Sequence, residues 1–315
     1  MSSTAETERR GVLLADAVHA DGKGRKRFTP QWRDWLFALP YLLLFGVFLL
    51  YPLLQGLGLS FMRYDLVSPE PPQFAGLSNY AEAFGDAYFW RAMWASLLFV
   101  MLCSPLTIGV ALLLAAMIDA VPGVRQHFYR AAIFAPTILT VSVAALLWRW
   151  LYNTEFGPLN AMLGVVGLGP VPWLNAPFLA MLSLVLMTLW WTVGGPVLIL
   201  LAGLKGIPDQ VHEAAAVDGS TGVHAFFHVT LPLLRPALLF VTVLNVIGGF
   251  QVFGQAFLIT GGGPSLSTRV MVQYIYETAF RGYRLGYGAA MSWLLFTVIA
   301  VFAVAQFRLM REDDK

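Results

Sequence analysis

The chain has 315 residues, of which 58% are hydrophobic and 12% are charged, whereas an ordinary soluble domain carries about 25% charged residues. This deficit of charge excludes a water-soluble globular protein and indicates lipid as the solvent. The net charge of +2 is too small to indicate nucleic-acid binding, and the single cysteine, Cys103, excludes a disulfide bond within the chain.

The first 34 residues are polar and carry seven of the lysines and arginines. No short apolar segment with a small-residue cleavage site precedes Trp35, so this is not the pattern of a cleaved secretory signal. We expect a disordered tail at 1–34 and a second short tail at 309–315, both cytoplasmic.

Six later stretches each hold 20 or more mostly apolar residues, the length that a lipid-spanning helix needs. They contain no Asp, Glu or Lys, and backbone groups in hydrocarbon must pair internally, so we expect helices rather than sheets. The sequence therefore predicts an all-α, polytopic membrane domain over 35–308. The predicted spans are 35–61, 89–117, 131–152, 178–204, 237–259 and 285–307. Five prolines within them, at 40, 52, 105, 136 and 196, are compatible with packing kinks or with hinges.

The connections between these spans alternate between two sides of the membrane. One side, with both termini and the connections 118–130 and 205–236, carries 14 of the 20 lysines and arginines. Because positively charged loops stay in the cytoplasm, we expect both termini and the 205–236 loop to be cytoplasmic.

The 205–236 loop is longer than a turn between two spans requires. Pro208 suits the first turn of a helix, and Gly219 can take the left-handed conformation that ends it. Ser220 or Thr221 can cap a second helix, which Pro232 is expected to stop. A short helix with alanines at 214–216 and one carboxylate, Glu213, suits close approach by another protein. An amphipathic helix resting on the membrane surface is the alternative.

The same loop resembles the Glu-Ala-Ala loop of the permease subunits of binding-protein-dependent ABC importers. Its pattern is Glu-Ala-Ala, three residues, Gly, nine residues, Ile-x-Leu-Pro. The matching positions here are Glu213, Ala214, Ala215, Gly219, Val229, Leu231 and Pro232, with valine in place of isoleucine. Asp218 and Phe226 resemble the carbohydrate-importer branch. The resemblance covers about 35–308, and segment 258–280 looks closest to the larger maltose-permease subunit and to sugar and glycerol-phosphate permeases.

This resemblance implies a type I importer permease fold and a division of labour between chains. A second permease subunit would complete the pathway, an ATPase dimer would bind the loop and use ATP and Mg²⁺, and an extracytoplasmic solute-binding protein would deliver the solute. The coupling residues implied are Glu213, Ala214, Ala215, Asp218, Gly219, Leu231 and Pro232. The localisation implied is the inner membrane of the cell.

Neutral polar and aromatic residues within the spans are candidates for contact with a sugar, which needs hydroxyl and amide partners and an aromatic face. The polar candidates are Thr137, Thr140, Thr188, Thr192, Asn245 and Gln251, and the aromatic ones are Trp190, Trp191 and Phe250. Back-bonding to the helix explains the threonines equally well, and a helix–helix hydrogen bond explains Asn245 and Gln251. The sequence does not reveal which sugar is carried, although the scarcity of arginine in the spans favours a neutral one.

Two other functions remain as alternatives. A secondary transporter commonly needs a carboxylate within the membrane, and none of the predicted spans has one. A membrane enzyme would need a catalytic cluster or a metal site, and we expect no catalytic residue. His224 and His228 have a metal-ligand spacing without a third ligand nearby. The chain also lacks the phosphate loop of an ATPase, so we expect it to bind no cofactor.

Overall fold

The computed structural model describes the backbone of residues 32–311 and the side chains of residues 36–308. The predicted tails at 1–34 and 309–315 lie outside the described residues, apart from 32–34 and 309–311, which are helical. The chain divides into two compact units, residues 1–54 and 55–315.

The first unit contains one apolar helix in the part of it that the structure describes. It runs through α2 (Trp32–Phe45), a π-helical segment (Gly46–Leu50) and the first residues of α3 (Tyr51–Ser60). Residues Leu36–Ser60 are long and apolar enough to cross a membrane, as predicted for 35–61.

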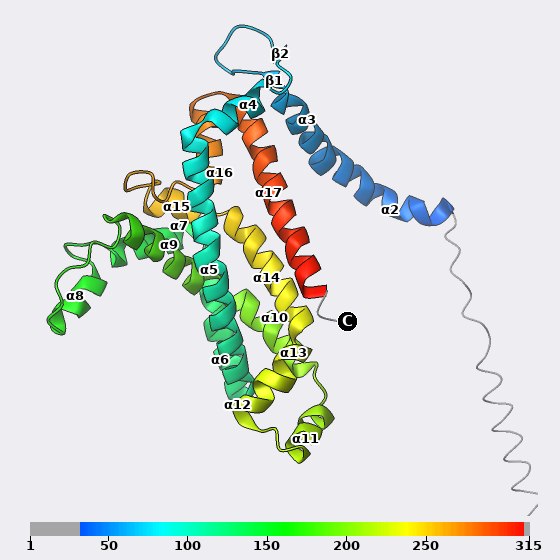
Figure 1. Cartoon of the computed structure of the whole chain (residues 1–315), viewed down its shortest axis with the longest axis vertical. Coiled ribbons are helices and arrows are strands. Elements are labelled where there is room, and N and C mark those ends of the chain that lie inside the picture. The colour runs from blue at the N-terminus through cyan, green and yellow to red at the C-terminus, as the bar shows by residue number, and fades with distance from the viewer. Residues whose placement is uncertain (1–31, 312–315) are drawn as a thin grey trace, which may run out of the picture. The chain divides into compact units, whose positions relative to one another are not determined.

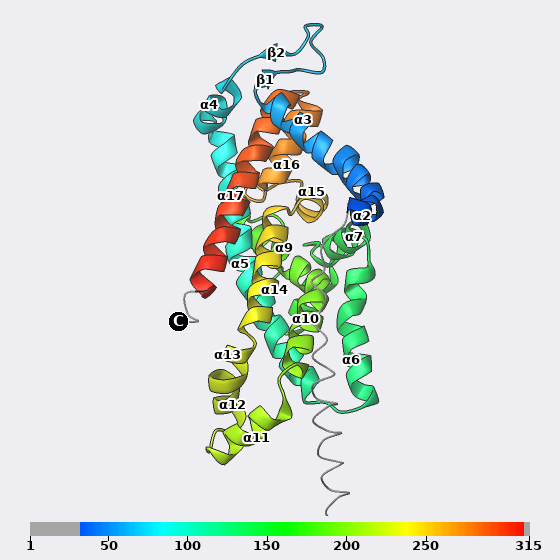
Figure 2. The ribbon, with the colours of Figure 1, turned by 90° about the vertical axis from the view of Figure 1, so that its right-hand side faces the viewer.

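The described part of the second unit consists of helices and one small hairpin. Two of its helices, α5 (Ala87–Asp119) and α17 (Leu285–Arg311), are long and unbroken and match the predicted spans at 89–117 and 285–307. A hairpin of β1 (Met62–Arg63) and β2 (Gln73–Phe74), with Met62 opposite Phe74, precedes α4 (Ser78–Gly85). In Figures 1 and 2 this hairpin lies at the opposite end of the unit from the helices of the 205–236 loop.

The three remaining predicted spans are not single helices, contrary to expectation. Helix α6 (Val124–Phe134) with a 3₁₀ turn (Ala135–Ile138) meets α7 (Val141–Leu151) at 94°. Helix α9 (Pro177–Thr192) meets α10 (Gly194–Lys205) at 52°. A third bent pair, Gly222–Leu233 and Arg235–Phe250, meets at 71°. If each of the three bent pairs is one span, the described chain has up to six spans.

The fifth predicted span, 237–259, is also divided. Helix α14 (Arg235–Phe250) ends at Gln251, and α15 (Gly254–Ile259) follows as a separate short helix. A loop then leads to α16 (Met271–Tyr276) and a π-helical segment (Glu277–Arg281) before α17. Earlier in the chain, α8 (Pro158–Val165) lies within the connection between α7 and α9.

The bends have local causes that the apolar composition conceals. Leu139 and Thr140 leave the helical region with ψ of 142° and 151°, and the Thr140 side chain accepts a hydrogen bond from the Val143 amide, so it caps α7. At the second bend, a side chain at Gly194 would lie 2.8 Å from the Ile133 carbonyl oxygen. Only glycine allows these two bent spans to touch there.

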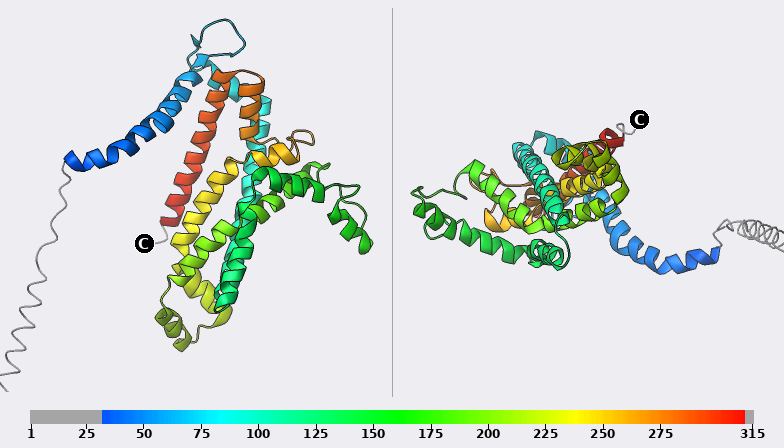
Figure 3. Two further views of the ribbon diagram at one scale, coloured as in Figure 1. Left: turned by 180° about the vertical axis from the view of Figure 1, so that it is seen from behind. Right: turned by 90° about the horizontal axis from the view of Figure 1, so that it is seen from below.

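The core follows α5, which contributes buried residues to three apolar clusters: Phe99 to one, Val100 to the second and Ala111 to the third. Helices α10 and α14 both contact α5 and each other. Figure 3 shows these three helices, in teal, light green and yellow, running together toward the end with the loop helices.

Candidate functional site

A cavity of 430 Å³ lies between α5, α9, α10, α14 and α15, within the range of ligand-binding pockets. Of the described residues that line it, none is charged. They are Phe99, Cys103, Thr188, Trp191, Thr192, Gly195, Pro196, Ile199, Val241, Leu244, Asn245, Gly248, Gly249, Val252 and Gln255. An uncharged wall of this kind suits a neutral solute better than an anion or a cation.

Four polar side chains interrupt the apolar wall. Thr192 donates to the Thr188 carbonyl (2.7 Å) and Asn245 donates to the Val241 carbonyl (3.0 Å), so both bond back to their own helices. The Thr188 hydroxyl is buried without a hydrogen-bond partner in the described chain. Gln255 is also buried and makes no hydrogen bond with any described residue. Because buried polar groups are normally paired, these two can bind a solute or water.

Trp191 and Thr137 form the corner where two bent spans meet. The Thr137 hydroxyl donates to the Trp191 carbonyl, and the Trp191 indole N–H donates to the Leu139 carbonyl, both at 3.0 Å. The second bond pairs a carbonyl that the bend takes out of its helix. Thr137 therefore holds the corner and does not line the cavity, whereas Trp191 does both.

Four other sequence candidates lie elsewhere. Thr140 caps α7, Trp190 packs on Trp148 with ring centroids 5.6 Å apart, and Gln251 is exposed at the end of α14. Phe250 is fully buried and packs on Phe302 rather than facing the cavity. The sequence analysis did not identify Gln255, Phe99 and Cys103 as cavity-lining residues. Gln255 could have been found, because it is a glutamine within an apolar run.

The loop between α10 and α14 contains the predicted short helix, α11 (Asp209–Val217), preceded by Pro208. The Ser220 amide donates to the Ala215 carbonyl (2.8 Å) and the Gly219 amide donates to the Ala216 carbonyl (3.1 Å). With a Gly219 φ of +80°, this is a Schellman termination. Gly219 thus takes the left-handed conformation that the sequence predicts.

The face that α11 presents differs in part from expectation. Ala215 is buried against the loop, whereas Glu213, Ala214 and Asp218 are exposed. The Glu213 side chain has no ion pair or hydrogen bond with any residue that the structure describes. Val217 is 88% exposed, which sequence reasoning missed. A side chain this apolar and this exposed, beside a free carboxylate, is compatible with a protein contact.

A second helix runs back through α12 (Gly222–Ala225), a π-helical segment (Phe226–Thr230) and α13 (Leu231–Leu233). Thr221 occupies its N-cap position, but the Thr221 side chain makes no capping bond. Pro232 does not stop this helix, contrary to expectation. The π-helical turn before Pro232 accommodates the proline, and the chain bends by 71° only after Leu233.

The two histidines of this second helix have structural roles. Their rings stack with centroids 4.1 Å apart, and Nδ1 of His228 lies 3.0 Å from the His224 carbonyl oxygen. Within residues 36–308, no group of three or more metal-ligating side chains comes together.

An open groove of 370 Å³ lies between α11 and α12, lined by His212, Ala216, Ser220, Thr221, Gly222, Ala225, Phe226 and Thr230.

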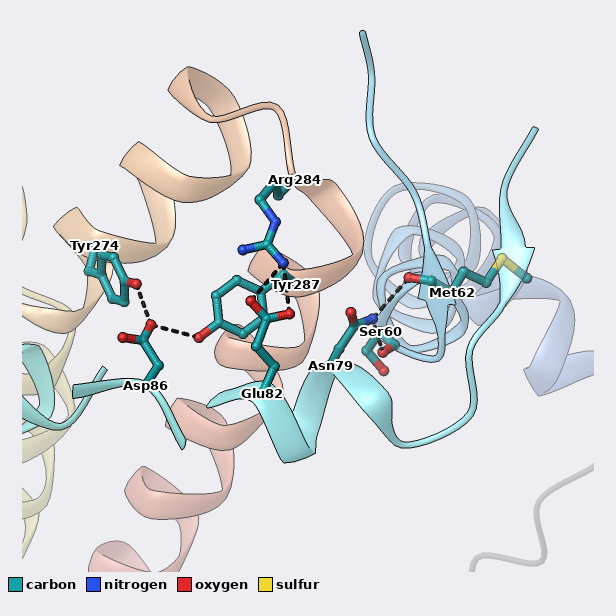
Figure 4. A network of polar contacts seen from close by, with 8 residues as sticks. All are labelled: Ser60, Met62, Asn79, Glu82, Asp86, Tyr274, Arg284 and Tyr287. Carbon is teal, nitrogen blue, oxygen red and sulfur yellow. Dashed lines mark hydrogen bonds and ion pairs between the residues drawn. The ribbon is translucent and has the colours of Figure 1, made fainter. Parts of the chain in front are cut away.

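At the opposite end, polar residues join the starts of α5 and α17 (Figure 4). The hydroxyls of Tyr274 and Tyr287 (2.8 Å for the latter) both donate to the Asp86 carboxylate. Arg284 donates to both Glu82 oxygens at 2.7 Å, and Asn79 donates to the Ser60 and Met62 carbonyls at 2.9 Å. Hydrogen bonds thus connect the hairpin, α4, α5, α16 and α17. The sequence analysis did not identify this network.

The charge on Asp86 is stabilised by this arrangement. Burial raises the pKa of Asp86, but hydrogen bonds from Tyr274, Tyr287 and the Tyr88 and Phe89 amides outweigh burial and hold that pKa below its ordinary value. Burial, together with the bond to Asp86, raises the pKa of Tyr274 to about 12. The network therefore keeps an ionised carboxylate and a neutral phenol throughout the neutral range.

Known proteins of similar sequence are transport permeases. The chain is 31% identical over 297 residues to the sulfoquinovosyl glycerol transport system permease protein of Agrobacterium fabrum, covering 90% of this chain and 96% of that protein. It is 34% identical to a probable ABC transporter permease protein of Bacillus subtilis, covering 94% and 96%. It is 33% identical to the sn-glycerol-3-phosphate transport system permease protein of Yersinia pseudotuberculosis, covering 91% and 97%. No protein-family model matches the chain.

The fold is also that of a solved transporter. A bacterial ABC transporter involved in the import of the acidic polysaccharide alginate superimposes with a TM-score of 0.78 at 24% identity, covering 90% of this chain and 97% of that one. The match confirms the fold predicted from the sequence. Together with relatives that match over nearly their whole length, it shows that the chain belongs to the permease subunits of carbohydrate-uptake ABC importers.

Proposed function

We propose that this chain forms, with a second permease subunit, the membrane pathway of an ATP-driven importer for a neutral sugar or oligosaccharide. An extracytoplasmic solute-binding protein delivers the solute; in support, the bacterial alginate ABC transporter was solved in complex with an alginate pentasaccharide-bound periplasmic protein. A separate ATPase dimer uses ATP and Mg²⁺, while this chain binds no cofactor. Both termini and the 205–236 loop face the cytoplasm.

One observation carries this proposal: the two helices that flank the loop also line the cavity. Helix α10 contributes Gly195, Pro196 and Ile199 to the wall and ends at Lys205, where the loop begins. Helix α14 begins at Arg235, where the loop ends, and contributes Val241 and Asn245 among others. Because helices are stiff, a displacement of the loop by a bound ATPase moves two walls of the cavity.

The cavity favours a neutral solute. Charged groups buried without partners are costly, and the lining offers hydroxyls, amides and an indole ring but no arginine or lysine. Trp191 supplies an aromatic face for a sugar ring, and Thr188 and Gln255 supply unpaired polar groups. Several relatives carry anionic solutes by name, so the substrate class must be tested directly.

Reconstitution tests the proposal. Proteoliposomes with this chain alone should take up no sugar under any ion gradient, and ATP-dependent uptake should require the second permease, the ATPase and the binding protein. Uptake driven by an ion gradient through this chain alone would instead indicate a secondary transporter.

The coupling role of the loop needs its own variant. Replacing Glu213 by lysine should reduce ATP-driven uptake and retention of the ATPase by at least tenfold, because an exposed, unpaired carboxylate is reversed. Asp209→Lys reverses another exposed carboxylate of the same helix and is the matched control. Equal effects of the two reversals would refute a specific role for Glu213.

A further inference from the structure

The connection between α7 and α9 differs in chemistry from a loop surrounded by water. Apart from Glu155, this connection, residues 152–176, contains no Asp, Glu, Lys, Arg or His. Within the connection, the large apolar side chains of Phe156, Met162, Val165, Val166 and Leu168 are all exposed, and Val165 reaches 87% exposure. Isolated exposed apolar residues are ordinary, but a contiguous group on one element indicates a surface that is covered in the working molecule.

The Asn160 side chain and the amides that follow α8 are paired within this connection. Asn160 Nδ2 donates to the Thr154 and Val171 carbonyls (3.1 and 3.0 Å), and Asn160 Oδ1 accepts from the Val171 amide and the Trp173 indole N–H (3.1 and 2.9 Å). The amides of 166, 167 and 168, which follow α8, donate to the Leu163 and Gly164 carbonyls. Such pairing is what a lipid environment requires, because hydrocarbon offers no hydrogen-bond partner.

The inner face of the connection is fixed to the helical bundle. The Trp173 ring packs on Tyr152 with centroids 5.7 Å apart, the Tyr152 hydroxyl donates to the Ser183 carbonyl (3.0 Å), and the Ser183 hydroxyl donates to the Trp173 carbonyl (3.2 Å). Helix α8 therefore has a fixed inner face, with Asn160 buried, and an outer face that carries Met162, Val165 and Val166. The outer face is apolar, and the one polar side chain of α8, Asn160, is turned inward.

The position of α8 in the chain favours lipid as the environment that covers its exposed apolar face. It joins the ends of two spanning segments, and α7 itself exposes Val143, Leu146 and Trp150. Between Trp150 of α7 and Phe156, Glu155 is the one charged residue, so a single charge interrupts the exposed apolar surface that leads from α7 to α8. We propose that α8 and its flanks, residues 156–178, form an interfacial anchor that lies in the bilayer at the boundary between headgroups and hydrocarbon, with Val165 facing the acyl chains.

The anchor can be tested by spin labelling of the assembled transporter in lipid nanodiscs, without its binding protein. In a Cys103→Ser background, which removes the only native thiol, a nitroxide is attached at Val165→Cys and, in a second variant, at Met162→Cys. Val67→Cys is the matched control, because Val67 is 68% exposed in the hairpin loop beside Asp65. Collision with oxygen, which concentrates in lipid, is compared with collision with a water-soluble nickel chelate.

The proposal predicts that oxygen reaches the labels at 162 and 165 while the nickel chelate is excluded, and that the chelate reaches the label at 67. Access of the chelate to 162 and 165 would place the connection in water and overturn the proposal. Exclusion of both reagents would also overturn it, because the surface would then be covered by protein, such as the second permease. Neither result depends on which solute the transporter carries.

Discussion

Substitution of Gly219 tests how much one left-handed backbone conformation contributes to the 205–236 loop, which we propose to bind the ATPase. Gly219 has φ of +80°, and an added Cβ there would meet no heavy atom within 4 Å. A substitution therefore costs only the backbone energy of the left-handed region, roughly 1–2 kcal/mol for a residue such as valine. Asparagine visits this region more readily, so Gly219→Asn is the matched variant.

That cost appears first in the two hydrogen bonds that end α11. Opening of the amides at positions 219 and 220 should become about 5- to 30-fold more frequent in Gly219→Val, which amide hydrogen exchange measures directly. ATP-driven uptake should fall in the same variant and largely persist in Gly219→Asn. Equal exchange and uptake in the two variants would refute the reasoning, because the termination of α11 would then not set the loop geometry.

Three further predictions concern the cavity wall and the opposite end of the unit. Thr188→Val should leave stability unchanged or raise it, because the hydroxyl that it removes is unpaired. The same substitution should raise the KM for sugar uptake. The control is Thr192→Val, which removes a hydroxyl that bonds its own helix and should leave KM unchanged. Trp191→Phe should lower thermal stability by about 1–3 kcal/mol by leaving the Leu139 carbonyl unpaired, as thermal unfolding in detergent measures. Asp86→Asn should lower stability at neutral pH. The pKa of Asp86 in the folded protein lies below its ordinary value of 3.8. The stability difference between the protein and Asp86→Asn is therefore fully present above pH 3.8 and disappears as pH falls through the pKa of the folded state. A stability difference that stays constant down to pH 2 would contradict this assignment.

The sequence predicts the extent of the helices better than their continuity. Hydropathy locates α5 and α17 within a few residues because each is one unbroken apolar run. The break at Leu139 and Thr140 lies in a run that is just as apolar, and it is stabilised by Trp191, about fifty residues later. Composition along the chain carries no information about such a partner.

The site shows the same division between local and distant causes. The left-handed Gly219 was predictable because it depends on its own turn. The faces of α14 were not, because packing against α17 decides that Phe250 is buried and that Asn245 meets the cavity. The bonds of Tyr274 and Tyr287 to Asp86 join residues 188 and 201 positions apart, a separation at which no pattern in the sequence is visible.

The right-angled bend between α6 and α7 affects how a pathway lined by such helices can move. Leu139 and Thr140 have extended backbone and belong to neither helix, so rotation about their φ and ψ changes the angle between the two segments without breaking a hydrogen bond inside either one. One half of such a span can therefore swing while the hydrogen bonds within each helical segment are kept. The two bonds between Thr137, Trp191 and Leu139 are the contacts that such a swing must keep or exchange.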